Sequence, residues 1–124
     1  MVSNKHLFPD YILQNREFLR IIAKTRSKNQ FNNLLITANT DQILAITEII
    51  HNILQGSVPL SKLKRIKLAK NADYYRKIAK SKSRKGAIEN IQSGGGIGLL
   101  SAILAPVLSI LSQGILERAL NKYT

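Results

Sequence analysis

Residues 40–59 read TDQILAITEIIHNILQGSVP and contain the clearest helix signal in the chain. Four isoleucines recur at the spacing of one helix face, and two leucines widen this apolar stripe: Ile43, Ile46, Ile50 and Ile53, with Leu44 and Leu54. Thr40 suits an N-cap and Asp41 suits the positive end of a helix. Gly56 suits the left-handed residue after a helix, and Pro59 prevents its continuation. The stretch therefore predicts an amphipathic helix with both ends defined.

Toward the N-terminus, the sequence predicts two further helices. Pro9 and Asp10 suit a helix start, and an apolar face follows to about Lys24, formed by Tyr11, Ile12, Phe18, Leu19 and Ile22. The polar residues around 27–29 separate this helix from a brief one near residues 31–38. Residues 1–58 are therefore expected to form a head of three short helices.

Toward the C-terminus, residues 59–86 form a basic arm that we expect to be one long helix from the Ser61 cap to about Ser81. Its apolar stripe is thin and consists of Leu68, Ala72, Tyr75 and Ala79, so the helix is expected to lean on a partner without being buried. Eleven of the 19 Lys and Arg residues lie here, opposed only by Asp73: Lys62, Lys64, Arg65, Lys67, Lys70, Arg76, Lys77, Lys80, Lys82, Arg84 and Lys85.

Beyond the arm, residues 87–96 are expected to be a glycine-rich joint, because Gly94–Gly96 weaken any helix through them. Residues 97–124 are expected to form an apolar C-terminal helix, since no charged residue occurs between Asn90 and Leu116. One broad side of this helix is lined by Leu99, Leu100, Ile103, Leu104, Val107, Ile110, Leu111 and Ile115. The residues predicted to contact a membrane are these eight together with Ile97 and Leu108. Small residues line the other side. The predicted fold class is all-α.

The residue inventory gives no indication of an enzyme, a metal site or a cofactor. The chain has no cysteine, and His6 and His51 have no partner at metal-ligand spacing. The seven acidic residues are scattered, no nucleophile–base pair is visible, and Gly94–Gly96 lacks the Lys and hydroxyl of a P-loop. We expect no catalytic residues.

The basic arm predicts a polyanionic partner, because the 124-residue chain has a formal net charge of +12. Nucleic acid, most simply DNA, is the first interpretation, and no motif for reading base sequence is present. If about 6 of the cations met phosphates, the logarithm of the affinity would fall with a slope of about −5 against the logarithm of the salt concentration. An anionic membrane surface and simple solvation of the arm are the alternatives.

The apolar C-terminal helix predicts either a membrane segment or a core helix. Twenty residues of helix span about 30 Å, the thickness of a bilayer core. The eleven Leu, Ile and Val residues from Ile97 to Leu116 would contribute on the order of −5 kcal/mol to insertion, while Pro106, Gln113 and the serines oppose it. Ser101, Ala105 and Ser109 have the small-xxx-small spacing of a homo-oligomeric helix contact. The other interpretation is a helix packed against the apolar stripes of the head.

The order of these features resembles that of small basic proteins encoded by Polinton/Maverick elements and adintoviruses. The resemblance covers roughly residues 16–116 and rests on REFLR at 16–20, NILQG at 52–56, VPLS at 58–61, the basic arm, GGGIGLL at 94–100 and APVL at 105–108. In plan, such proteins are similar to adenovirus minor core and membrane-active proteins. The resemblance implies a virion-associated accessory protein that binds DNA or disrupts membranes.

These observations predict a non-enzymatic accessory protein of a virus-like element, present in the virion or in the host nucleus or cytoplasm. It would bind nucleic acid non-specifically through the basic arm and act on membranes through the C-terminal helix. One alternative is a tail-anchored membrane protein whose basic arm lies on anionic lipid in the cytosol. Another is a helical interaction module whose C-terminal helix packs in its own core.

Overall fold

The computed structural model describes residues 10–93 and 97–123, and the side chains within these ranges other than those of Tyr11, Ile97 and residues 112–123. All regular secondary structure in these ranges is helical, which confirms the predicted all-α class. The helices are α1 (Asp10–Gln14), α2 (Arg16–Lys24), α3 (Lys28–Thr37), α4 (Thr40–Leu54), α5 (Lys62–Lys70), α6 (Ala72–Ala79), α7 (Arg84–Ser93) and α8 (Ile97–Tyr123). The predicted helix start at Pro9 and the glycine triplet Gly94–Gly96 lie outside the described residues.

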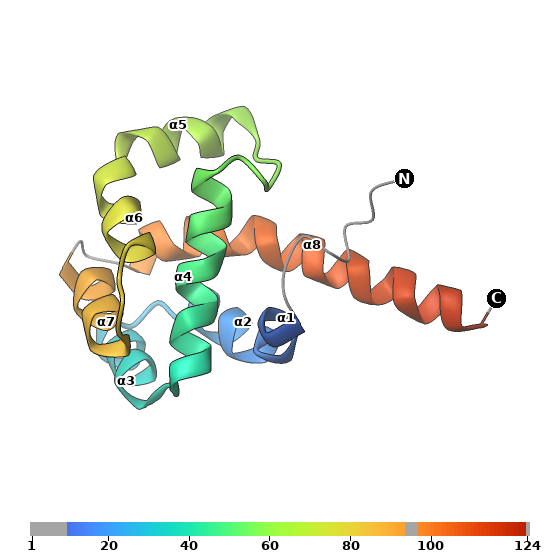
Figure 1. Ribbon diagram of the computed structural model, residues 1–124, viewed down its shortest axis with the longest axis horizontal. Coiled ribbons are helices and arrows are strands. Elements are labelled where there is room, and N and C mark those ends of the chain that lie inside the picture. The colour runs from blue at the N-terminus through green and yellow to red at the C-terminus, as the bar shows by residue number, and fades with distance from the viewer. Residues whose placement is uncertain (1–9, 94–96, 124) are drawn as a thin grey trace.

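Helix α4 stands at the centre of the fold, with the other helices arranged around it (Figure 1). It contacts α1, α2, α6, α7 and α8. Contact on so many sides explains why α4 buries more than the predicted stripe: Ile43, Ala45, Ile46, Thr47, Ile49, Ile50 and Ile53. The prediction for Leu44 was wrong: this residue was expected to widen the buried stripe, but its side chain is 41% exposed.

Both ends of α4 are closed by local hydrogen bonds. The backbone N–H of Gln42 donates to Asn39 Oδ1 at 2.8 Å, and the Asn39 N–H donates to Gln42 Oε1 at 2.9 Å. This reciprocal capping box makes Asn39 the N-cap and corrects the prediction of Thr40. At the other end Gly56 has φ +78°, and the Ser57 N–H donates to the Asn52 carbonyl at 3.0 Å. The left-handed C-terminal cap predicted at Gly56 is therefore confirmed.

The head differs from its predicted boundaries in two places. The helix expected from Asp10 to Lys24 is interrupted at Asn15, which separates α1 from α2. The helix expected at residues 31–38 begins earlier, because the Ser27 side chain caps it by accepting from the Gln30 N–H at 3.4 Å. Ile12, Leu19 and Ile22 are buried, as their apolar face predicted.

Helices α6, α7 and α8, from the C-terminal half of the chain, complete the core. Helix α8 packs mainly on α2 and also contacts α4 and α5, while α6 and α7 pack on α4. Residues 87–93, which the sequence analysis assigned to the joint, form most of α7 and bury Ala87, Ile88 and Ile91. Figure 1 shows the C-terminal part of α8 running past the other helices.

Candidate polyanion-binding surface

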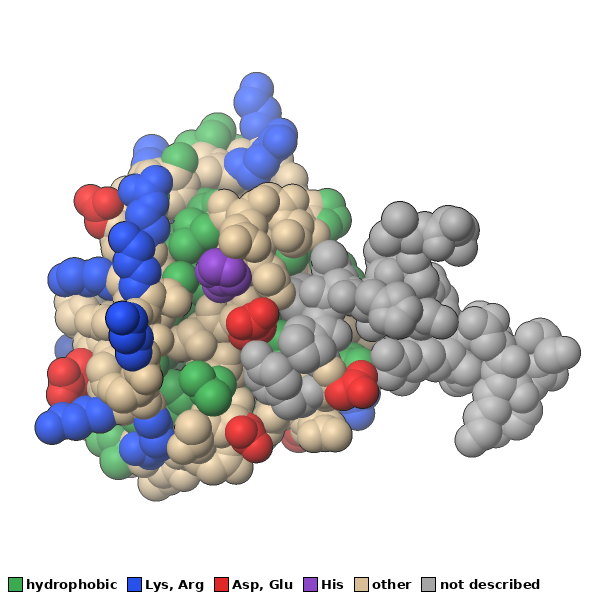
Figure 2. Space-filling model, viewed as in Figure 1, with side chains coloured by type: hydrophobic (Ala, Val, Ile, Leu, Met, Phe, Trp, Pro, Cys, Tyr) green, Lys and Arg blue, Asp and Glu red, His purple; other side chains and the backbone are tan. Residues whose placement is uncertain are grey.

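The eleven predicted nucleic-acid-binding residues lie on three short helices and one connection. Five are on α5, two on α6, two between α6 and α7, and two at the start of α7. Nine are exposed, and Lys64 and Arg84 are half-buried. In Figure 2 the Lys and Arg side chains form a column along the edge where α5, α6 and α7 follow one another in Figure 1.

The predicted single long helix of the basic arm is wrong, because the helix ends at Lys70 and restarts at Ala72. Asn71, with φ −116° and ψ 25°, forms the elbow. Its Nδ2 donates to the Lys67 carbonyl at 2.9 Å, and its backbone N–H donates to the Leu68 carbonyl at 3.2 Å. Asparagine favours such a break because its side chain competes with the helix for backbone partners.

The elbow lets α6 pack on α4, which the thin apolar stripe did not predict. Tyr75 and Ile78 are fully buried in α6, although Ile78 was not part of the predicted stripe. The Tyr75 hydroxyl donates to the Leu99 carbonyl at 2.7 Å, and the Tyr74 hydroxyl donates to the Ile91 carbonyl at 2.7 Å. Two hydrogen bonds thus tie the middle of the basic arm to α7 and α8.

Burial changes the acidity of both phenols. Desolvation raises the pKa of Tyr75 to about 12 and raises the pKa of Tyr74 further. Their rings meet edge to face, with centroids 5.3 Å apart. These tyrosines are packing residues of the folded domain, so the structure does not present them as stacking platforms for bases.

Arg84 has a structural contact that the sequence analysis missed. Its Nε donates to the Ala38 carbonyl at 2.9 Å, and a second guanidinium nitrogen donates to the Ile36 carbonyl. These carbonyls lie at the C-terminal end of α3. The last carbonyls of a helix have no N–H partner within the helix, and the negative end of the helix dipole attracts a cation. Arg84 therefore fastens α7 to α3, and a contact of Arg84 with nucleic acid stays a prediction.

The segment between α6 and α7 is held by side-chain hydrogen bonds. Ser81 Oγ donates to the Lys77 carbonyl at 3.1 Å, and Asn90 Nδ2 donates to Ser81 Oγ at 2.9 Å. Ser83 Oγ accepts from the Gly86 N–H at 3.0 Å at the start of α7. Lys80 and Lys82 therefore project from a connection whose conformation is held by these hydrogen bonds.

The basic surface, as the term is used below, consists of the ten cations that remain after Arg84 is excluded: Lys62, Lys64, Arg65, Lys67, Lys70, Arg76, Lys77, Lys80, Lys82 and Lys85. Among the described residues, ion pairs occur at Glu17–Arg20 and at Asp73–Arg76, the latter at 3.4 Å. Of the ten, Arg76 alone has an ion-pair partner among the described side chains. The other nine cations on this edge have no ion-pair partner within that part of the chain.

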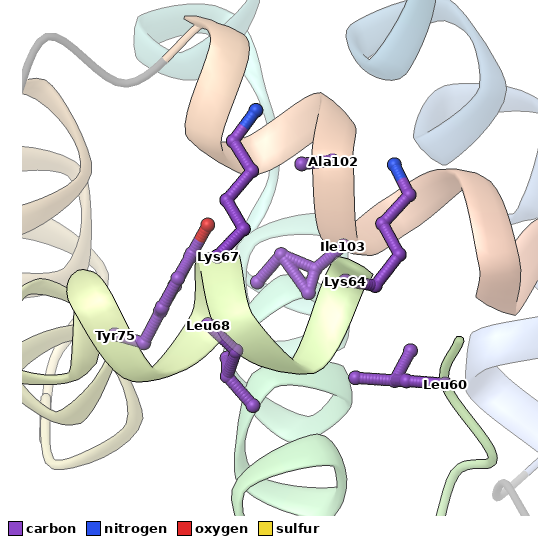
Figure 3. Close-up of a pocket in the computed structure, with 7 residues that line it drawn as sticks. All are labelled: Leu60, Lys64, Lys67, Leu68, Tyr75, Ala102 and Ile103. Atoms are coloured by element: carbon purple, nitrogen blue, oxygen red, sulfur yellow. The ribbon is translucent and has the colours of Figure 1, made fainter. Parts of the chain in front are cut away.

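On the side that faces α8, the basic surface has a small apolar cleft of about 10 Å³. It is lined by Leu60, Lys64, Lys67, Leu68, Tyr75, Ala102 and Ile103 (Figure 3). This volume accommodates about one water molecule, so the cleft is a packing joint. Figure 3 shows Lys64 and Lys67 extending to the same side, with their ammonium groups away from Leu60 and Leu68.

A second group of cations lies between α2 and α8. Arg20, Lys24 and Arg26 line an open groove with Ser101, Ala105, Leu108 and Ser109. Arg20 is engaged by Glu17, and this hydrogen bond lowers the pKa of the Glu17 carboxyl. Ser101 Oγ donates to the Ala23 carbonyl at 2.8 Å, so this member of the small-xxx-small series contacts α2.

The residues predicted to contact a membrane are divided between the core and the surface of α8. Five are buried in the core: Leu100, Ile103, Leu104, Val107 and Leu111. Leu99, Leu108 and Ile110 are half-buried against that core, while the side chains of Ile97 and Ile115 lie outside the described residues. In the folded protein the buried five contact other helices instead of lipid, and a role of α8 in membranes stays a prediction.

Within the described ranges, no helix taken alone has the length and apolarity needed to cross a bilayer. Residues Arg84–Ser93 and Gly98–Leu111 reach the required length and composition only together, and they are bent by 114° relative to each other. Residues 10–93 and 97–123 also contain no cluster of three or more His, Cys, Asp or Glu residues that would hold a metal ion.

Comparison of the chain with protein-family models, with curated proteins and with solved structures gave no match.

Proposed function

We propose that this protein binds double-stranded DNA without sequence specificity through the basic surface on α5, α6 and α7. The observation that supports this proposal is the set of nine cations along one edge that form no ion pair with any described acidic side chain. A cation without a local partner gains most from meeting a phosphate, because binding releases the counterions condensed on the nucleic acid.

The arrangement of the surface agrees with backbone contact. Lysine predominates, and lysine acts toward phosphate as a point charge with little geometric selectivity. Flexible side chains on short helices, joined at the Asn71 elbow and by the connection from Lys80 to Ser83, suit binding to a repeating backbone of charge. The only aromatic residues within the arm, Tyr74 and Tyr75, are occupied in packing.

The biological setting that we propose is an accessory protein of a virus-like element, associated with the packaged genome. Its support is the resemblance of residues 16–116 to small basic proteins of Polinton/Maverick elements and adintoviruses. A protein of this charge would lower the repulsion between neighbouring duplexes in a confined particle. Mass spectrometry of purified particles, before and after nuclease treatment, would test this association.

The decisive experiment measures affinity for a fluorescent duplex by anisotropy over a series of salt concentrations. The natural protein is expected to give a slope of about −5 in a double-logarithmic plot. Replacing Lys77, Lys80 and Lys82 together by Gln removes three exposed cations of the basic surface. If each met a phosphate, the slope would become shallower by about 2.7.

A matched control removes the same charge elsewhere. Lys24, Arg26 and Lys28 are exposed at the end of α2 and the start of α3, and their replacement by Gln lowers the net charge equally. The slope of this control is expected to stay close to that of the natural protein. Affinity indifferent to salt would refute the proposal, and equal losses in both triple variants would refute the location of the binding surface.

A further inference from the structure

Helix α5 is the one helix in the described ranges that buries no side chain. It lies at the edge of the molecule in Figure 1. Two large apolar side chains point away from the core: Leu63 is 79% exposed and Ile66 is 45% exposed. Leu63 is the most exposed large hydrophobic side chain among those described.

The two apolar residues and two lysines share the outward face of α5. Leu63 and Ile66 are three residues apart, so they are neighbours on the helix surface. At 3.6 residues per turn, Lys70 follows in the same direction one turn later, and Lys62 lies at the edge of this face. Lys64, Lys67 and Leu68 instead line the cleft between α5 and α8.

This outward face, termed the α5 face below, is positively charged. It consists of Leu63 and Ile66 with Lys62 and Lys70, and α5 contains no acidic residue. Figure 2 shows hydrophobic side chains among Lys and Arg side chains at the α5 end of the molecule. Exposed apolar side chains beside lysines match the two contacts that an anionic membrane interface offers, an apolar layer and negative charge.

We propose that the α5 face docks the protein on the surface of an anionic lipid bilayer. Leu63 and Ile66 enter the boundary between headgroups and acyl chains, while Lys62 and Lys70 contact lipid phosphates and carboxylates. The helix stays parallel to the membrane, and no part of the core has to open. The proposal goes beyond DNA binding and does not depend on it.

The charge and shape of the α5 face favour a bilayer over other occupants. A second copy of this chain would bring two sets of lysines together, which like-charge repulsion opposes. Nucleic acid offers phosphates but leaves Leu63 and Ile66 without an apolar partner. An acidic amphipathic helix of another protein would match the charge, but such helices dock in grooves, whereas Leu63 protrudes. A bilayer offers both negative charge and an apolar layer at the required depth.

The first test uses a fluorescent reporter at the tip of the α5 face. The chain contains no tryptophan, so Leu63→Trp creates a single one. With vesicles of phosphatidylcholine mixed with phosphatidylserine, its emission is expected to shift to the blue and to be quenched by brominated acyl chains. Pure phosphatidylcholine vesicles and duplex DNA are expected to leave the emission unchanged. A water-like emission on the anionic vesicles would overturn the proposal.

The second test separates apolar insertion from general attraction of charge. In vesicle flotation, Leu63→Ser with Ile66→Ser is expected to lower partitioning onto anionic vesicles about tenfold. The matched control is Ile36→Ser with Leu44→Ser, two exposed apolar residues on α3 and α4, and it is expected to partition like the natural protein. Equal partitioning of the two double variants would overturn the proposal.

Two further readouts identify the other outcomes. Affinity of the Leu63→Ser, Ile66→Ser variant for duplex DNA is expected to be unchanged, because no cation has been removed. This result keeps the test independent of the proposed DNA binding. A blue shift in the emission of the Leu63→Trp variant that grows with protein concentration and needs no lipid would show self-association through the α5 face, and would replace the bilayer by a second copy.

Discussion

At the scale of single residues, Arg84 and Tyr75 show that side chains of the basic arm also hold the fold together. Both belong to a segment whose composition predicts a solvent-exposed helix that binds a polyanionic partner. Arg84 nevertheless donates to carbonyls of α3 and of the residue that follows it, and Tyr75 to a carbonyl of α8. Each contact spans at least 24 residues of sequence. Because short-range patterns contain no information on such distant acceptors, the sequence did not predict these structural contacts of Arg84 and Tyr75.

Stability at alkaline pH is expected to depend on Tyr75. Its folded pKa of about 12 exceeds the value near 10 of an unfolded tyrosine. Between these values the unfolded state has lost the proton that the folded state keeps, so the free energy of unfolding falls as pH rises. Below pH 10 this contribution is fully present.

Urea unfolding of Tyr75→Phe, followed by circular dichroism from pH 9 to pH 11.5, tests this expectation. At pH 9 the variant is expected to be about 1 kcal/mol less stable, because the Leu99 carbonyl loses its donor. Its loss of stability with rising pH is expected to be smaller than that of the natural protein, since lysine titration is common to both. Parallel pH profiles would contradict the role of the phenol.

At the scale of helices, α8 is where the sequence left two interpretations open. A run of uncharged, aliphatic residues is typical both of a membrane segment and of a core helix, and composition alone does not separate them. In the structure α8 packs on α2 and buries Leu100, Leu104 and Val107 completely. The first half of α8 is therefore a structural element of the folded domain.

Truncation of Leu104 tests how firmly α8 belongs to the core. Leu104 is fully buried, so Leu104→Ala is expected to lower the free energy of unfolding by about 3 kcal/mol. Leu63→Ala removes the same atoms from a 79% exposed site and is expected to change stability by less than about 0.5 kcal/mol. Urea unfolding measures both. If the two variants had equal stability, α8 would not be packed in the core in solution.

At the scale of the whole molecule, a net charge of +12 opposes folding and favours polyanions at the same time. Bringing many cations together costs free energy of self-repulsion, which dissolved salt screens. A bound polyanion removes that repulsion more effectively, but salt weakens its binding. The two effects of salt on stability therefore have opposite signs.

Thermal unfolding of the free protein and of its complex with duplex DNA tests this opposition. The Tm of the free protein is expected to rise as sodium chloride is increased. The Tm with excess duplex is expected to start higher and to fall, because stabilisation by the ligand decreases with its affinity. If duplex left the Tm unchanged at low salt, the folded protein would have no preference for DNA over the unfolded chain.

The sequence by itself determined the local features of this protein. Helical class, the boundaries of α4 to within a residue and the left-handed turn at Gly56 follow from the spacing of apolar side chains and from backbone preferences. The concentration of charge in residues 61–86 is likewise a property of the chain alone. These features depend on interactions between residues a few positions apart.

Only the tertiary structure decided which side of each element is buried. It divided the basic arm at Asn71, placed Ile78 in the core, joined Arg84 to α3 and left Leu63 and Ile66 exposed on α5. The physical reason is that burial depends on contacts between helices distant in sequence, such as α2 with α8 and α4 with α6. An apolar residue has the same local preferences whether a neighbouring helix covers it or not.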